Sequence, residues 1–153
     1  MATAWDVLAG RVQVGEQVLV IGGNALGLET ADFLATQGSI VEVVEMLEHV
    51  GRDLGPMVRW HLRHRLVELG VRLVTSTRAA EISDEDVLLV DKEGRSTRRA
   101  VESVILAVGS VSRNELVHEV EGMAREVHVI GDASRPRNGL FAIREGAEVG
   151  RRI

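Results

Sequence analysis

The stretch from Val18 to Glu29 constrains the fold of this chain more than any other part of the sequence. It begins with an apolar run, residues 18–21, of the length and composition of a buried β-strand. A glycine-rich turn, Gly-Gly-Asn-Ala-Leu-Gly, follows at once and leads into a helical pattern at residues 25–36. A strand that turns directly into a helix predicts the first β-α unit of a parallel sheet.

The turn comes close to Gly-x-Gly-x-x-Gly, the pattern of β-α units that bind dinucleotides, but Asn24 stands at the middle glycine position. Gly22 lets the chain leave the strand sharply, and Gly27 lets the helix pack closely on the sheet. The free N–H groups and positive dipole of the helix N-terminus would then face a pyrophosphate. Asparagine tolerates positive φ, so we expect the backbone path to be kept and the Asn24 side chain to swing aside or donate a hydrogen bond. The alternative is a tight turn without a ligand. The residues expected to cradle the pyrophosphate are Gly22, Gly23, Asn24, Ala25 and Gly27.

An acidic residue closes the second apolar run, at residues 40–44. Glu45 stands where dinucleotide-binding units place the carboxylate that accepts hydrogen bonds from the adenosine ribose. A carboxylate there favours NAD(H), because it repels the 2′-phosphate of NADP(H). Arg52 leaves NADP(H) open, since its guanidinium could pair with that phosphate. The alternative for Glu45 is a solvated residue at a strand end.

The whole pattern predicts an α/β, Rossmann-like, three-layer fold with helices on both faces of a parallel core sheet. A capping pattern at Thr3–Asp6 predicts a short first helix, and Pro56 opens a later one. Residues 79–100 predict a short antiparallel meander with a turn at residues 91–94. A strand–helix appendage closes the chain. The further strands are expected at residues 71–75, 79–82, 87–90, 96–100, 103–108 and 127–130, and the further helices at residues 56–69 and 140–153.

Composition excludes several classes of site. The net charge is −5, without any long basic run, which argues against a nucleic-acid surface. The chain has no cysteine, so disulfides, thiolate nucleophiles and cysteine-ligated clusters are excluded from it. No apolar run is long enough to span a membrane, and the N-terminus lacks the pattern of a signal peptide. These features lead us to expect a cytoplasmic protein.

Three stretches together resemble the C-terminal part of the NADH:flavin oxidoreductase family, which includes 2,4-dienoyl-CoA reductase, 2-enoate reductase and trimethylamine dehydrogenase. The first is residues 20–31, and the second is residues 44–51 with Arg59-Trp60 beyond them. The third is Val-Ile-Gly-Asp-Ala at residues 129–133, followed by Ala-Ile-Arg-Glu-Gly at residues 142–146. The stretches keep the family's order and span nearly the whole chain.

The resemblance implies two parts. Residues 1–112 would be a NAD(P)-binding domain, and residues 113–153 would be the returning C-terminal piece of an FAD-binding domain packed on it. The family's flavin barrel and the first half of its FAD domain have no counterpart in this sequence, so FAD would bind only in the intact enzyme. The expected partners are those missing portions or a companion subunit that supplies them. The chain could also be a piece of a longer protein, a short stand-alone gene or a gene remnant.

The resemblance also suggests roles for residues outside the turn. Glu29 would face the nicotinamide side of the cleft, or act only as a favourable charge near the helix N-terminus. Gly109 would correspond to a second glycine of the family's pattern at the cofactor cleft, or it would simply end a strand. Asp132 would hold the ribityl chain of FAD.

A second face of the predicted helix 56–69 carries Trp60, with Met57, His64 and Val67 near it at helical spacing. This face could associate with the missing domains, with a companion subunit or with a second copy of the chain, or it could lie along the domain's own surface. His61 and His64 are spaced to share a metal, but no carboxylate or cysteine completes a site. We therefore expect solvated histidines and no metal.

No nucleophile, base and orienting group form a catalytic set in this sequence, and we predict no catalytic residue. In the intact enzyme, NADH would deliver hydride to FAD, and the protein would supply position and electrostatics. The isolated chain would bind NADH but hardly turn over. The alternative is a non-redox module that binds ADP or a partner subunit, with Asn24 blocking the extended dinucleotide.

Overall fold

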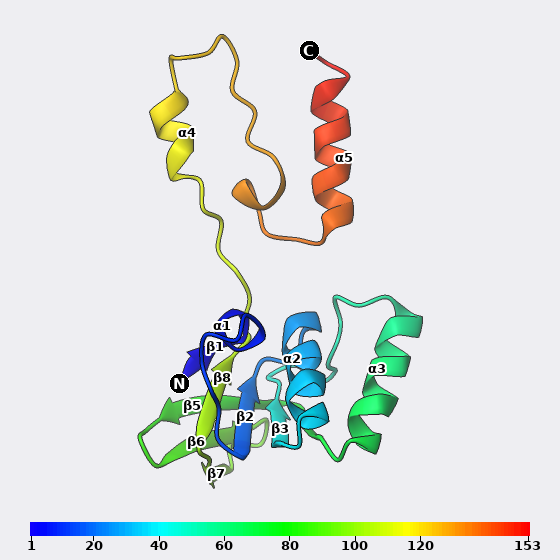
Figure 1. The fold of residues 1–153 in the computed structure, drawn as a ribbon, viewed down its shortest axis with the longest axis vertical. Coiled ribbons are helices and arrows are strands. Elements are labelled where there is room, and N and C mark those ends of the chain that lie inside the picture. The colour runs from blue at the N-terminus through cyan, green and yellow to red at the C-terminus, as the bar shows by residue number, and fades with distance from the viewer. The chain divides into compact units, whose positions relative to one another are not determined.

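The computed structural model describes residues 1–153, which divide into two compact units, Met1–Gly109 and Ser110–Ile153 (Figure 1). In the first unit the helices are α1 (Ala4–Leu8), α2 (Ala25–Thr36) and α3 (Pro56–Glu68). Its strands are β1 (Ala2–Thr3), β2 (Gln17–Ile21), β3 (Ile40–Val44), β4 (Arg72–Val74), β5 (Thr77–Ile82), β6 (Asp86–Asp91), β7 (Ser96–Ala100) and β8 (Ser103–Leu106). The second unit contains α4 (Glu115–Val120), the 3-10 turn η1 (Gly131–Ala133) and α5 (Gly139–Gly150).

The core of the first unit is a five-stranded parallel sheet in the order β1-β8-β2-β3-β4. Ile21 pairs with Val44 on one side and with Leu106 on the other, so β2, β3 and β8 end at the same edge. Val18, Leu19 and Val20 are all buried, as expected for a strand covered on both faces. The parallel α/β core predicted from the sequence is confirmed.

The two faces of this sheet are covered differently. Val20 and Val43 pack with Leu28 and Leu66, which come from α2 and α3, and α1 contributes to the same cluster. On the other face, Leu19 and Val44 pack against residues of β6 in the antiparallel sheet β5-β6-β7. The expectation of helices on both faces was therefore wrong. After β4 the chain continues into the meander, and the hydrophobic face of that sheet replaces the second helical layer.

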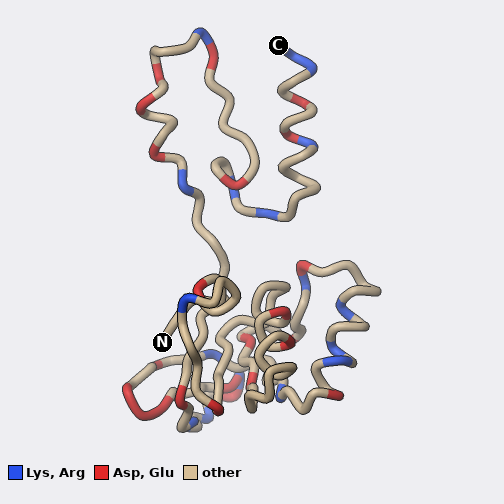
Figure 2. The backbone as a smooth tube through the Cα atoms, in the orientation of Figure 1, with Lys and Arg blue, Asp and Glu red and all other residues tan.

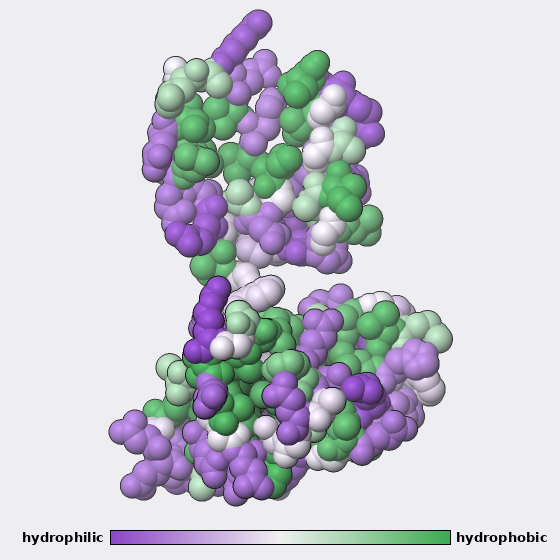
Figure 3. All heavy atoms as spheres, in the orientation of Figure 1, coloured by the Kyte–Doolittle hydropathy of each residue, from purple (hydrophilic) through white to green (hydrophobic).

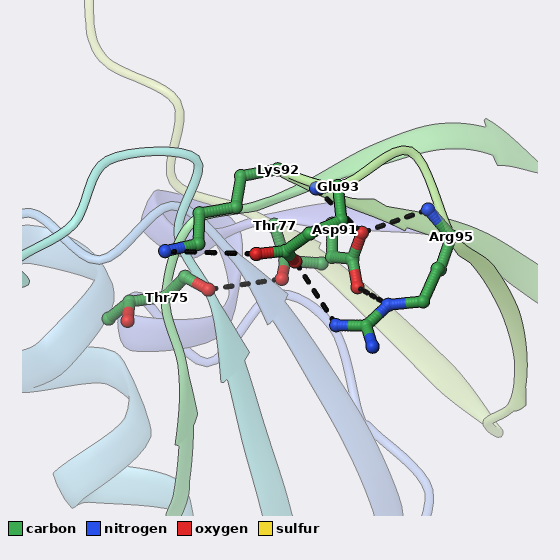
Figure 4. A network of polar contacts seen from close by, with 6 residues as sticks. All are labelled: Thr75, Thr77, Asp91, Lys92, Glu93 and Arg95. Atoms are coloured by element: carbon green, nitrogen blue, oxygen red, sulfur yellow. Dashed lines mark hydrogen bonds and ion pairs between the residues drawn. The ribbon is translucent and has the colours of Figure 1, made fainter.

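The hairpin between β6 and β7 closes through the turn that the sequence predicted. The carboxylate of Asp91 accepts hydrogen bonds from the backbone N–H groups of Glu93 and Arg95, at 3.0 and 2.9 Å (Figure 4). The Arg95 guanidinium returns to the same carboxylate at 2.8 Å. Desolvation raises the pKa of the Asp91 carboxyl group, but the hydrogen bonds and the charge of Arg95, with the bond from Glu93, together lower that pKa below its usual value. Asp91 thus fixes the local register by an Asx-type turn.

α3 is more exposed than its apolar stripe suggested. Leu66 is fully buried, and Leu62 packs partly against the core. Val58, by contrast, is 56% exposed. An ion pair of 2.5 Å between Arg65 and Asp32 connects α3 with α2. α3 is therefore held along a narrow contact, which leaves the rest of its surface to solvent.

The second unit differs from the prediction at residues 127–130, which form no strand. A β-strand needs a neighbour with which to exchange backbone hydrogen bonds, and Ser110–Ile153 contains no other strand. The final helix is present as α5. The sequence also did not reveal α4, η1 or the two-residue strand β1, whose pairing with β8 is set by tertiary context.

No residue of Ser110–Ile153 is buried, and several of its large apolar side chains are exposed. Figure 3 shows apolar side chains gathered at the surface of this unit. The exposed apolar side chains of residues 110–153 include Leu116 (65% exposed), Leu140 (72%) and Ile143 (74%). The unit therefore lacks a hydrophobic core of its own. None of the helices in either unit has the length and apolar character that a membrane crossing requires.

Candidate functional site

The glycine turn between β2 and α2 has the close approach that the sequence pattern implied. Gly22 adopts φ +109°, and a Cβ there would lie 2.4 Å from the Ala107 carbonyl oxygen. A Cβ on Gly27 would lie 1.9 Å from the Gly22 carbonyl oxygen. Side chains are excluded at both positions, because the obstacles are backbone atoms. The turn is thus held tightly against β8 and the first turn of α2.

Asn24 is accommodated without positive φ, since it is the N-cap of α2 with φ −77°. Its side-chain oxygen accepts a hydrogen bond from Gly27 N–H at 3.0 Å, and its amide donates to the Ala107 carbonyl at 2.5 Å. Both ends of the Asn24 side chain are therefore engaged within the protein. The backbone path is kept, but not because asparagine tolerates positive φ, since the φ of Asn24 is negative. Asn24 instead acts as a helix cap, for which asparagine is among the preferred residues.

Glu45 is 9% exposed and lies immediately after β3. One carboxylate oxygen accepts from Gly23 N–H at 2.7 Å, and the other accepts from Leu47 N–H at 2.8 Å. The alternative of a freely solvated residue is therefore wrong. Each carboxylate oxygen has a second lone pair, so these bonds leave capacity for a ribose hydroxyl. Glu45 connects the glycine turn to the end of the neighbouring strand.

The backbone N–H groups at the start of α2 are only partly satisfied within the protein. Those of Asn24 and Leu26 have no hydrogen-bond partner in the chain. The N–H of Ala25 lies 3.0 Å from each carboxylate oxygen of Asp53, a residue that the sequence analysis did not single out. Asp53 belongs to the loop between β3 and α3, and no sequence signal indicated that this loop returns to the turn. The site thus already contains one anion.

The remaining predicted residues of the first unit have less distinctive surroundings. Glu29 is exposed and lines a hollow between α2 and α3, together with Met57, Trp60 and His61. Gly109 has φ +109° and open space around its Cβ position, so only its backbone conformation calls for glycine. Arg52 is exposed, and no ion pair restrains it. Roles for these residues in cofactor binding stay predictions.

The hollow beside α3 is lined by apolar side chains, by histidines and by charged groups of both signs. Trp60 is 54% exposed, and its ring lies 4.9 Å from the His61 ring and 4.3 Å from the His64 ring, measured between centroids. Arg65 lines the hollow together with the acidic Glu29 and Glu68. Figure 2 shows the charged positions along the backbone of this helix. No group of three His, Cys, Asp or Glu side chains lies close enough to hold a metal.

In the second unit, Asp132 lies in η1 and accepts a hydrogen bond from Arg137 N–H at 3.2 Å. Glu145 of α5 accepts from Gly131 N–H at 2.8 Å and forms an ion pair with Arg137. These two bonds, the Arg137 bond first, lower the pKa of the Glu145 carboxyl group. The predicted contact of Asp132 with an FAD ribityl chain stays a prediction.

Comparison with known proteins agrees with this geometry. A family model described as pyridine nucleotide-disulphide oxidoreductase matches residues 4–143. The chain is 38% identical over 149 residues to an NADH oxidase of Thermoanaerobacter brockii, covering 95% of this chain and 23% of that protein. It is 34% identical over 171 residues to a metal reductase of Desulforamulus reducens, covering 93% of this chain and 25% of that protein. The chain thus spans about a quarter of the length of these relatives.

Solved structures of oxidoreductases also resemble this chain. A 2-naphthoyl-CoA reductase complex superposes with a TM-score of 0.90 at 30% identity, covering 99% of this chain and 23% of that one. A histamine dehydrogenase from Rhizobium sp. 4-9 superposes with a TM-score of 0.89 at 18% identity, covering all of this chain and 26% of that one, which shows the fold alone. The family match, the related reductases and the glycine turn lead to one assignment. The chain belongs to the pyridine nucleotide-disulphide oxidoreductase family.

Proposed function

We propose that this chain is the NADH-binding part of a flavin-dependent oxidoreductase of the NADH:flavin oxidoreductase type. The observation that carries the proposal is the glycine turn, where Gly22 and Gly27 leave no room for side chains and α2 begins with unpaired N–H groups. A pyrophosphate is the ligand that suits these donors and the positive end of the helix dipole. The buried Glu45 would accept hydrogen bonds from the adenosine ribose, which favours NADH over NADPH.

In the intact enzyme, NADH bound at this turn would reduce FAD, and electrons would then pass to a flavin barrel. The chain's own residues would bind and orient the nicotinamide nucleotide, while the hydride chemistry belongs to the two cofactors. Gly109 and Glu29 would line the path of the nicotinamide, and Asp132 would contact FAD. The relatives named NADH oxidase and metal reductase support a redox role.

The remaining parts of the enzyme would come from further polypeptide, either in the same protein or in a companion subunit. Two features support this part of the proposal: the relatives are about four times as long, and Ser110–Ile153 contains no buried residue. The exposed face around Trp60 would be a second contact for those parts, or for a second copy of the chain.

The alternative of an ADP-binding or purely structural module depended on Asn24 obstructing the extended dinucleotide. The amide of Asn24 instead donates to the Ala107 carbonyl, and its oxygen accepts from Gly27 N–H, so neither the Asn24 nor the Leu26 backbone N–H is taken up by this side chain. That orientation supports a complete dinucleotide as the ligand.

Isothermal titration with NADH, NADPH, ADP and FAD tests the proposal. We expect NADH and ADP to bind, NADPH to bind at least about tenfold more weakly, and FAD to bind poorly to the isolated chain. Gly27→Ala should abolish binding, because its Cβ meets the Gly22 carbonyl oxygen at 1.9 Å. Gly150→Ala is the control, since open space surrounds that position. Equal affinities of wild type and Gly27→Ala for NADH would overturn the proposal.

A further inference from the structure

The loop between β3 and α3 supplies an anion to the glycine turn. Asp53 places both carboxylate oxygens 3.0 Å from Ala25 N, so one N–H is shared between them. Ala25 is the first residue of α2, where the positive end of the helix dipole favours negative charge. A bound pyrophosphate would seek the same donor, because its oxygens are recognised by the N–H groups of this turn.

We propose that Asp53 is a resident competitor for the pyrophosphate, which a dinucleotide must displace in order to bind. This inference rests on the proposed function, since it concerns the same site. The carboxylate satisfies Ala25 N–H and neutralises the helix end while the site is empty. On binding, phosphate oxygens replace it, and a negative side chain must leave the neighbourhood of a negative ligand.

The surroundings of Asp53 permit this exchange without rebuilding the loop. Gly51 N–H donates to the Gly23 carbonyl at 2.6 Å, and Val50 is 3% exposed, so the loop is fixed to the turn just before Asp53. Asp53 itself is exposed, and its only hydrogen bonds are those to Ala25 N–H. Rotation of the side chain into solvent is therefore sufficient. The structure predicts a site whose affinity is lowered by its own carboxylate while its geometry is kept.

The test compares the full chain with Asp53→Ala and Asp53→Asn by titration with NADH and ADP. Glu48→Ala is the matched control, because Glu48 is an exposed carboxylate of the same loop that makes no hydrogen bond. We expect Asp53→Ala to lower the Kd for both nucleotides about tenfold, and Asp53→Asn to lower it less, since an uncharged oxygen can still accept from Ala25. Without nucleotide, Asp53→Ala should also lower the melting temperature, because Ala25 N–H loses its acceptor. Glu48→Ala should change neither quantity.

The outcomes separate this inference from the function on which it rests. If the wild type binds NADH and the Kd of Asp53→Ala is unchanged or higher, Asp53 is not a competitor, although the nucleotide site stands. If neither protein binds either nucleotide, the proposed function fails together with the inference. Binding that becomes measurable only in Asp53→Ala would be the strongest support for the competitor.

Discussion

At the scale of single residues, two polar side chains connect the glycine turn to the ends of the strands on either side of β2. Asn24 connects the turn to the Ala107 carbonyl just after β8, and Glu45 connects it to the end of β3. Asn24 also accepts a hydrogen bond from Gly27 N–H, and Glu45 also accepts one from Leu47 N–H. The geometry of the turn thus depends on these side chains as well as on its glycines.

Glu45→Gln should therefore weaken both folding and binding. The amide that replaces the carboxylate would turn its NH₂ towards either Gly23 N–H or Leu47 N–H, so that one donor faces another. Hydrogen bonds to charged groups contribute about 1.5–3 kcal/mol, so we expect the free energy of unfolding to fall by about 1–3 kcal/mol. Chemical denaturation measures this loss, and titration with NADH should show weaker binding in the same variant. Glu48→Gln is the control, because Glu48 is exposed. If Glu45→Gln were as stable as the wild type, Glu45 would not stabilise the turn through these hydrogen bonds.

At the scale of elements, the boundaries of α2 and β3 were predictable because their signals are local. A cap at Asn24, a glycine after the helix and an uninterrupted apolar run each determine where an element begins or ends. Elements that depend on distant partners were not predictable in this way. Residues 127–130 have the composition of a strand but no strand beside them, and the β5-β6-β7 sheet takes the place of helices that a parallel sheet usually carries.

The same distinction between local and long-range signals applies to the residues of the candidate site. The glycine positions and the location of Glu45 at a strand end follow from the spacing of the motif. The capping role of Asn24 does not, because the motif has glycine at that position. The presence of Asp53 at the start of α2 could not be predicted from the motif spacing either. It depends on a backbone hydrogen bond between Gly51 and Gly23, residues far apart in the chain, which no local pattern encodes.

The connection between η1 and α5 should depend on pH. Arg137 and Gly131 N–H lower the pKa of Glu145 below its ordinary value of 4.5, so the contact is complete above that value and is lost as the pH falls through the lowered pKa. The amide resonance of Gly131, followed by NMR, should shift in that acidic range. Glu145→Gln should abolish the shift, whereas Glu148→Gln should preserve it, because Glu148 pairs with Arg144 and does not contact η1. A Gly131 titration that persists in Glu145→Gln would contradict this assignment.

At the scale of the whole molecule, the two units differ in how much they bury. Met1–Gly109 contains all the buried residues, whereas Ser110–Ile153 contains none. Amide exchange in native proteins follows local stability, which is lowest where few apolar contacts are buried. We expect the amides of α5 to exchange at least about a hundredfold faster than those of β2 and β3, as measured by hydrogen–deuterium exchange. Equal protection in the two units would contradict this prediction and would imply that the second unit is covered in solution.

The exposed ring of Trp60 has a practical consequence for measurements of nucleotide binding. The chain contains two tryptophans and no tyrosine, and Trp5 lies in α1, so Trp5→Phe would leave Trp60 as the dominant emitter of its ultraviolet fluorescence. Trp60 lines the same hollow as Glu29, which stands in the first turns of the helix that begins at the glycine turn. Reduced nicotinamide absorbs where tryptophan emits. The protein thus contains its own optical donor next to the helix that would bind the nucleotide, and occupancy can be followed without any added label.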